Sequence, residues 1–140
     1  MKFWAKAIGV IHSPFKVPEE APQQGAWSEA ISEIEVFEEF AAGLEGLQGA
    51  SHILVLYWCH RSSREMLHAK PPHEERPKGV FATRSPHRPN PIALCVAKVL
   101  EMKGRTLRVK GLDALDGSPL IDLKPYYREL DALPDDPEST

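Results

Sequence analysis

The sequence contains few cysteines and no long hydrophobic run. Its two cysteines, Cys59 and Cys95, each lie in an apolar stretch and lack the C-x-x-C spacing of a metal or redox motif. This pattern indicates buried free thiols in a reducing compartment, with one disulfide as the alternative. The longest apolar run, residues 53–59, is far shorter than the ~20 residues of a membrane helix, and the first residues lack the hydrophobic segment of a signal peptide. We therefore expect a cytoplasmic protein without a membrane segment.

Several familiar nucleotide and metal motifs are also missing. Neither G-x-G-x-x-G nor G-x-x-x-x-G-K-[ST] occurs, which argues against a Rossmann nucleotide site and against a P-loop. The H-x-E and P-C-x-x-C pair of the zinc base deaminases does not occur either. His68 and His73 have no cysteine pair beside them, so we expect no metal site. Any chemistry is then expected to depend on loops at one end of a β-structure.

The charge of the chain is unevenly distributed. The 140 residues suffice for one domain, with 42% hydrophobic residues and a net charge of −3. Residues 61–88 hold seven lysines and arginines against three glutamates, a net charge of +4, which leaves −7 for the remainder. This asymmetry points to an anionic partner, with nucleic acid the most natural candidate. The simpler interpretation is a solvated loop.

A proline-rich segment, residues 79–92, reads G-V-F-A-T-R-S-P-H-R-P-N-P-I. Proline fixes φ and removes a backbone donor, so three prolines within six residues exclude the interior of a helix and a central strand. The residue before each proline is held extended, and the segment therefore displays Arg84 and Arg88 on a stiff loop. Such rigidity suits a binding site, whereas a surface crossover with solvated arginines is the alternative.

Apolar alternation and turn residues predict a mainly β fold. We expect strands at residues 4–12, 31–37, 52–60, 80–82, 92–102, 106–111 and 120–126, with 52–60 as the central strand. Helical spacing of apolar residues predicts one short helix over residues 38–47. Long irregular loops are expected at residues 14–30 and 61–79, and two prolines after Asp131 predict a frayed tail.

The segment 79–92 resembles the signature of the TsaA-like, or TrmO-type, family of S-adenosylmethionine-dependent tRNA methyltransferases. The resemblance extends over almost the whole chain, at residues 8–14, 22–24, 51–52, 112–117 and 122–126. It implies a small single-domain β-barrel over residues 1–130, with residues 131–140 as a flexible tail. It also implies a homodimer, the commonest oligomer, that methylates N6 of a threonylcarbamoyl-modified adenosine beside the tRNA anticodon.

Residue by residue, the resemblance implies an S-adenosylmethionine site in the loops and the last strand. Its members are Pro22, Gln23, Gln24, His60, Arg61, Arg84, Leu94, Asp122, Leu123, Lys124 and Pro125. Arg84 suits the cofactor carboxylate and Asp122 suits its sulfonium. Asp122 is also the candidate catalytic residue, because its carboxylate could accept a hydrogen bond from the amine that is methylated. Gln23 stands where bacterial members commonly have arginine, which keeps open a non-catalytic S-adenosylmethionine- or RNA-binding barrel.

The basic segment supplies the candidate RNA contacts. We expect phosphates to be contacted by Arg61, Arg64, Arg76, Lys78 and Arg88. These contacts would position the tRNA without reading its bases, since a phosphate carries no sequence information.

Overall fold

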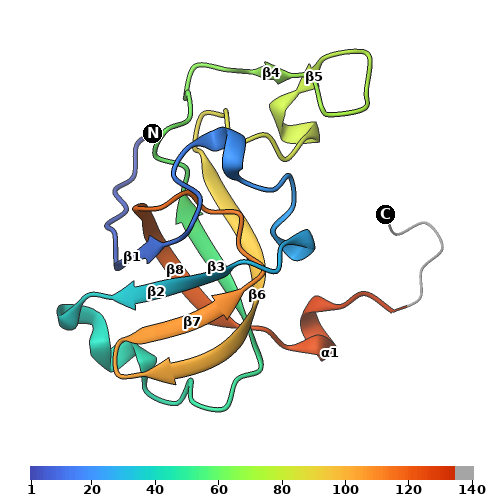
Figure 1. Ribbon diagram of the computed structural model, residues 1–140. Coiled ribbons are helices and arrows are strands. Elements are labelled where there is room, and N and C mark those ends of the chain that lie inside the picture. The colour runs from blue at the N-terminus through green and yellow to red at the C-terminus, as the bar shows by residue number, and fades with distance from the viewer. Residues whose placement is uncertain (135–140) are drawn as a thin grey trace.

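The computed structural model describes residues 1–134 and contains a closed barrel of antiparallel strands (Figure 1). The strands follow one another around the barrel in the order β1 (Gly9–His12), β2 (Ile31–Val36), β7 (Thr106–Lys110), β6 (Ile92–Lys103), β3 (His52–Trp58) and β8 (Ser118–Pro125). The strand expected to be central, β3, pairs with β6 on one side and with β8 on the other. The predicted mainly β barrel is confirmed.

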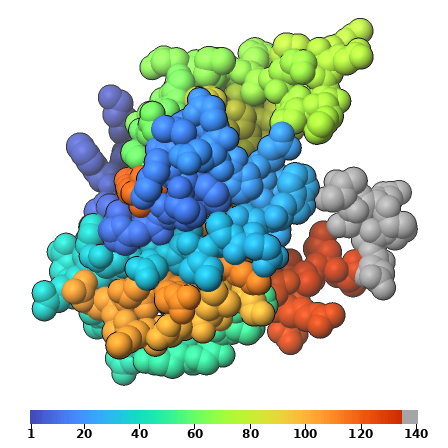
Figure 2. Space-filling view, in the orientation of Figure 1, coloured from blue at the N-terminus to red at the C-terminus, as the bar shows by residue number. Residues whose placement is uncertain are grey.

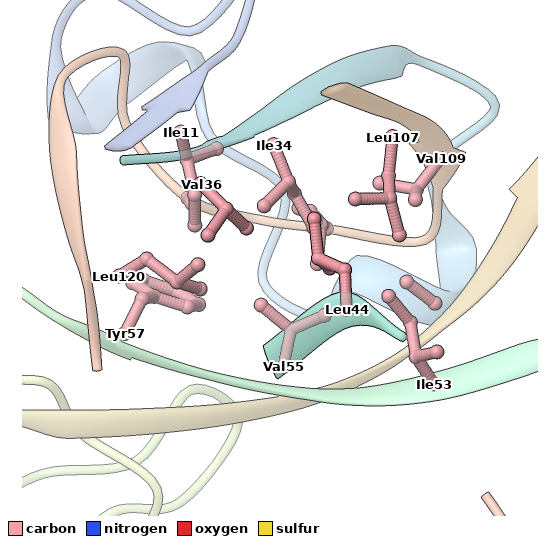
Figure 3. Packing of buried hydrophobic residues seen from close by; sticks show 13 residues of the cluster. Ile11, Ile34, Val36, Leu44, Ile53, Val55, Tyr57, Leu107, Val109 and Leu120 are labelled. Carbon is pink, nitrogen blue, oxygen red and sulfur yellow. The ribbon is translucent and has the colours of Figure 1, made fainter. Parts of the chain in front are cut away.

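Alternating side chains fill the interior of this barrel. Along β3, Ile53, Val55 and Tyr57 are buried, whereas the side chains between them face outward and are only partly covered. Figure 3 shows buried side chains from β1, β2, β3, β7 and β8 meeting inside the barrel, together with Leu44. A barrel of so few strands is narrow, and its interior is occupied by side chains. A ligand site must therefore lie on the loops or on the outer face.

A small lobe projects from one end of the barrel (Figure 1). It contains β4 (His68–Ala69), β5 (Lys78–Gly79) and a 3-10 turn, Val80–Ala82, where the sequence predicted a strand. The Val80 N–H donates to the Leu67 carbonyl oxygen at 2.9 Å, and the Thr83 N–H then donates back to the Val80 carbonyl oxygen. This second bond closes a turn, so the strand expected at residues 80–82 cannot form.

Two further elements differ from the predictions. The first strand begins at Gly9 and not at residue 4, because its partner β2 ends at Val36, which faces Gly9. The helix expected over residues 38–47 is a 3-10 helix, Glu38–Leu44. Glycines at positions 43 and 46 disfavour a longer α-helix there. The loop over residues 14–30 contains two further 3-10 turns, Pro18–Glu20 and Gly25–Trp27.

The described chain ends shortly after a short helix, α1 (Arg128–Asp131). This helix crosses the expected domain boundary at residue 130, and residues 135–140 of the predicted tail lie outside the described residues. Cys59 and Cys95 are free, so the disulfide alternative is wrong. Within residues 1–134, no helix has the length and apolar character needed to cross a membrane.

Candidate functional site

One half of the predicted cofactor site lies on the outer face of β8. A register shift opposite β3 pairs Leu56 with Asp122 and Tyr57 with Leu120, which leaves Ile121 as a bulge directly before Asp122. Bulges redirect the side chains that follow them and are common beside functional sites. β1 pairs with β8 only as far as Leu120, so the strand edge beyond this point has no neighbouring barrel strand.

Asp122 and Lys124 share the outward-facing side of β8. Their side chains form an ion pair of 3.1 Å between Lys124 Nζ and Asp122 Oδ2, and both are substantially exposed. Asp122 Oδ1 accepts a hydrogen bond of 2.9 Å from the Leu123 N–H. The Leu123 side chain is partly buried and packs against the core.

An apolar row continues this face across the neighbouring strands. Asp122 pairs with Leu56 of β3, and Leu56 pairs with Leu94 of β6. The three residues therefore lie side by side, with Leu94 60% exposed. The fold brings together two predicted cofactor residues, Leu94 and Asp122, that are distant in sequence.

The other half of the predicted site lies on loops at the barrel rim, where bonds from Ser13 and Lys16 to Asp116 form a clamp that reaches Arg61. Asp116 Oδ1 accepts the Ser13 N–H at 3.0 Å, and Asp116 Oδ2 accepts Lys16 Nζ at 2.9 Å. The Lys16 carbonyl oxygen in turn accepts a hydrogen bond from the Arg61 guanidinium at 3.1 Å. The bond from Lys16 and the bond from the Ser13 N–H hold the pKa of Asp116 below its usual range. The sequence did not single out this carboxylate.

The loop that carries Pro22, Gln23 and Gln24 is held in place by Gly25, which packs against the backbone of Gly111. Gly25 is buried, and a Cβ at this position would meet the Gly111 carbonyl oxygen and lie 3.1 Å from the Asp113 nitrogen. Only glycine permits so close an approach of two backbones. Gln23, two residues before Gly25, is exposed, and Gln24 is partly buried.

The proline-rich segment folds around Arg88. Its guanidinium donates to the carbonyl oxygens of Thr83 and Ser85, at 3.1 and 3.0 Å. Arg84 lies between these two carbonyls in sequence and is exposed. Within residues 1–134, the Arg84 side chain forms no hydrogen bond or ion pair, so its guanidinium is available to an anion. His60, at the end of β3, is likewise exposed.

The predicted phosphate contacts fall into two groups. Arg64 donates to the Pro89 carbonyl oxygen at 2.7 Å and lies over the Trp58 ring, and Arg88 holds its own loop. These two arginines therefore also support the structure. Lys78 forms an exposed ion pair with Glu74, a contact that contributes little stability and can be exchanged for a phosphate. Arg76 is exposed, and no hydrogen bond or ion pair of its side chain occurs within the described part of the chain.

A buried polar network, which the sequence also did not indicate, lies inside the rim. The Tyr57 hydroxyl and the Cys95 thiol both donate to Asp113 Oδ1. Burial, followed by the negative charge of Asp113, raises the pKa of Tyr57 far above its usual value and that of Cys95 to about 12. The same two causes raise the pKa of Cys59 to about 11. These groups are neutral at physiological pH, and Tyr57 and Cys95 act as structural donors.

The Leu94, Asp122 and Lys124 side chains of the candidate site lie at the surface. Two surface pockets lie elsewhere, one beside residues 99–102 of β6 and one beside Glu33 and Arg108. Neither includes a predicted site residue. No group of three His, Cys, Asp or Glu side chains within residues 1–134 is placed to hold a metal ion.

Comparison with known proteins identifies relatives over most of this chain. Residues 10–132 match the family model described as the tRNA-methyltransferase O N-terminal domain. An S-adenosyl-L-methionine-binding protein of Archaeoglobus fulgidus is 52% identical over 91% of this chain and 92% of its own length. A probable S-adenosyl-L-methionine-binding protein of Methanothermobacter thermautotrophicus is 49% identical over 95% of this chain and 96% of its own length.

Two further relatives are longer than this chain. The human tRNA (adenine(37)-N6)-methyltransferase is 35% identical over 89% of this chain, which spans 30% of the human protein. The crystal structure of TrmO from Pseudomonas aeruginosa superposes with a TM-score of 0.79 and 33% identity, over 97% of this chain and 61% of that one. Because the family model matches nearly the whole described chain and the fold agrees, the protein belongs to the family of tRNA-methyltransferase O N-terminal domains.

Proposed function

We propose that this protein binds S-adenosylmethionine and methylates N6 of an adenosine in tRNA, the threonylcarbamoyl-modified adenosine beside the anticodon. The observation that carries the proposal is the outer-face row of Asp122, Leu56 and Leu94, which the closed barrel brings together. Relatives named S-adenosyl-L-methionine-binding proteins and tRNA (adenine(37)-N6)-methyltransferases support it. A tRNA substrate also fits a cytoplasmic location.

The side chains at the site suit this cofactor. S-adenosylmethionine combines an adenine, a positively charged sulfonium and a carboxylate. Leu56 and Leu94 offer apolar surface, and the Asp122 carboxylate offers an oxygen to a cation. Arg84 offers an exposed guanidinium to a carboxylate. Backbone groups of residues 122–125, on the strand edge that β1 does not cover, can meet a base edge.

The protein's contribution to the reaction is to position the acceptor and to accept a proton. When bound, S-adenosylmethionine supplies the methyl group. Holding the acceptor amine at the right distance and angle supplies most of the rate in a displacement of this kind. Asp122 Oδ2 is held only by the exposed Lys124 ion pair, which is weak. This oxygen can therefore turn to the amine and accept a hydrogen bond from it.

A second copy of the chain is proposed to complete the site. The outer face of β3 and β6 is apolar over three paired positions, with Leu54, Leu56 and Trp58 facing Val96, Leu94 and Ile92, before the polar pair of His52 and Lys98. The three β6 side chains are all exposed. A contiguous apolar face of this kind marks an interface, and S-adenosylmethionine bound on an open face needs cover to be desolvated. We therefore propose a homodimer in which the partner covers this face.

A non-catalytic binding barrel is the second candidate. The Archaeoglobus and Methanothermobacter relatives, which match almost the full length of this chain, are named only as binding proteins. Gln23, in place of the arginine common in bacterial members, favours the same alternative.

The effect of Asp122→Asn on transfer of a labelled methyl group to tRNA tests the proposal. The amide keeps the shape of Asp122 but is a poor proton acceptor, so transfer measured at saturating S-adenosylmethionine should fall by about 10²-fold or more. Glu33→Gln, the same change from carboxylate to amide at an exposed position on β2 across the barrel, is the matched control and should leave the transfer rate intact. Equal rates for wild type and Asp122→Asn would show that Asp122 does not accept the proton of the acceptor amine.

A further inference from the structure

An exposed aromatic ring lies on the lobe that carries much of the positive charge of the protein. Phe81 is 81% exposed, although it directly follows Val80, which is 1% exposed. It belongs to the basic segment of residues 61–88, between Lys78 and Arg84. Figure 2 shows this lobe, in yellow-green, standing out from the rest of the molecule. A large apolar ring in this position is open to contact from solvent.

The ring is held outward by a rigid turn. Val80 is buried, and its N–H donates to the Leu67 carbonyl oxygen at 2.9 Å. The Val80 carbonyl oxygen accepts both the N–H and the hydroxyl of Thr83, at 3.0 and 2.9 Å. The side chains of successive residues in a 3-10 turn are about 120° apart around its axis. Because the Val80 side chain points into the core, the Phe81 side chain points away from it. A ring fixed in this way loses little entropy when it meets a ligand.

Two further apolar side chains of the lobe are exposed near Phe81 in the fold. β4 pairs with β5 with His68 opposite Gly79, and the bond from the Val80 N–H to the Leu67 carbonyl oxygen places the backbone of Leu67 against Val80. Met66 and Leu67 are both exposed. The lobe therefore exposes three apolar side chains, those of Met66, Leu67 and Phe81, which we call the lobe patch.

The charge around the lobe patch decides what kind of partner suits it. Arg76, Lys78 and Arg84 are exposed within a few residues of Phe81, and the segment carries +4 on a chain whose remainder carries −7. Single-stranded RNA combines anionic phosphates with unpaired bases, and proteins bind it by pairing cations with the phosphates and stacking aromatic rings on the bases. An apolar protein partner would gain nothing from the surrounding cations.

We propose that Phe81 is a stacking platform for an unpaired base of the RNA substrate. The proposal rests on the proposed function only in requiring that the substrate is RNA. The ring contributes affinity for the single-stranded loop, whereas the neighbouring cations contribute affinity for any phosphate backbone.

Fluorescence anisotropy with two labelled RNAs tests this role. The probes are a tRNA anticodon stem-loop and a fully paired duplex of equal length. Phe81→Ala should weaken stem-loop binding about tenfold, leave duplex binding unchanged and leave the salt dependence unchanged. Phe81→Trp, which keeps an aromatic ring at this position, should bind the stem-loop like wild type. Phe3→Ala, which removes a ring that is 84% exposed but lies outside the basic segment, is the matched control and should bind like wild type.

The outcomes separate this proposal from the proposed function. If wild-type protein binds the stem-loop and Phe81→Ala binds it equally well, stacking is refuted while an RNA substrate stands. If Phe81→Ala instead changes the mass of the protein in light scattering, the lobe patch is a contact between protein chains and the proposal is wrong. If wild-type protein binds neither RNA, the RNA substrate and the stacking role both fail.

Discussion

Arg84 is the residue whose role can be separated most cleanly from the stability of the fold. Its guanidinium is exposed and makes no internal hydrogen bond or ion pair within residues 1–134, while the loop around it is held by Arg88. Removing Arg84 should therefore leave the barrel intact. Removing Arg88 should release the carbonyl oxygens of Thr83 and Ser85 and loosen the whole segment.

We predict that Arg84→Ala weakens S-adenosylmethionine binding by about 1.5–3 kcal/mol, the loss expected for a hydrogen bond to a charged group. Titration calorimetry measures this loss directly. Arg76→Ala, which removes an equally exposed arginine from the same lobe, is the control and should retain wild-type affinity. Equal affinity of wild type and a folded Arg84→Ala variant would exclude the proposed carboxylate contact.

The two cysteines lead to a prediction about reactivity and pH. Burial and the charge of Asp113 raise the pKa of Cys59 to about 11 and that of Cys95 to about 12. Because the thiolate is the reactive form, both should react slowly with iodoacetamide at neutral pH in the native protein and rapidly after unfolding. Mass spectrometry of the labelled protein checks this expectation, and rapid native labelling of both thiols would contradict it.

The same raised pKa values have a consequence for stability. The thiols ionise more readily in the unfolded chain, where their pKa is about 8.5. Their contribution to the free energy of unfolding is therefore complete below that pH and declines as the pH rises toward 11. Replacing Cys95 by alanine should flatten this alkaline decline in denaturant titrations, and an unchanged slope would count against the assignment.

At the scale of elements, the loop over residues 14–30 depends on close backbone packing. Gly25→Ala would force its Cβ against the Gly111 carbonyl oxygen, so the loop must move, and Gln23 and Gln24 must move with it. We predict lower S-adenosylmethionine affinity and a lower melting temperature for this variant. Gly43→Ala is the matched control, because a Cβ at position 43 meets no atom within 4 Å. Unchanged cofactor affinity in Gly25→Ala would remove this loop from the site.

The elements also show what could be predicted from the sequence. The strand at β3 and the hairpin of β6 and β7 follow from local alternation and from the turn residues that end them. Proline spacing predicted that the segment around Arg84 is a stiff loop. Local patterns did not distinguish a 3-10 helix at Glu38–Leu44 from an α-helix, because both use similar apolar spacing.

The contacts that position the site could not be predicted in this way. The bond between Tyr57 and Asp113 joins residues far apart in sequence, and the clamp between Lys16 and Asp116 joins opposite ends of the chain. No sequence pattern near these residues indicates that either pair is in contact. The row of Asp122, Leu56 and Leu94 likewise arises only when the barrel closes.

At the scale of the whole molecule, the apolar outer face predicts the oligomeric state. We expect light scattering to give twice the chain mass of 15.7 kDa. Val96→Glu places a charge in this face and should produce a monomer. Ile31→Glu, at an exposed position on β2 across the barrel, is the matched control and should remain a dimer. A wild-type monomer that retains activity would exclude a shared site.

The charge distribution predicts how tRNA binding responds to salt. Exchanging both Arg76 and Lys78 for alanine should flatten the plot of log binding constant against log salt by roughly 0.9 for each phosphate that is no longer neutralised. Lys103→Ala, in the hairpin between β6 and β7, should change the slope little. Filter binding at several salt concentrations measures both. If only the Lys103 variant flattens the slope, the RNA face lies on that hairpin.

Mass spectrometry of tRNA nucleosides tests the proposed reaction most directly. The purified protein is incubated with S-adenosylmethionine carrying an isotope-labelled methyl group and with tRNA that either carries or lacks the threonylcarbamoyl modification. We predict a labelled methyl group on N6 of threonylcarbamoyladenosine beside the anticodon, and none on the unmodified tRNA. Protein that binds S-adenosylmethionine in calorimetry but leaves both tRNAs unlabelled would contradict the proposed activity and favour a binding module.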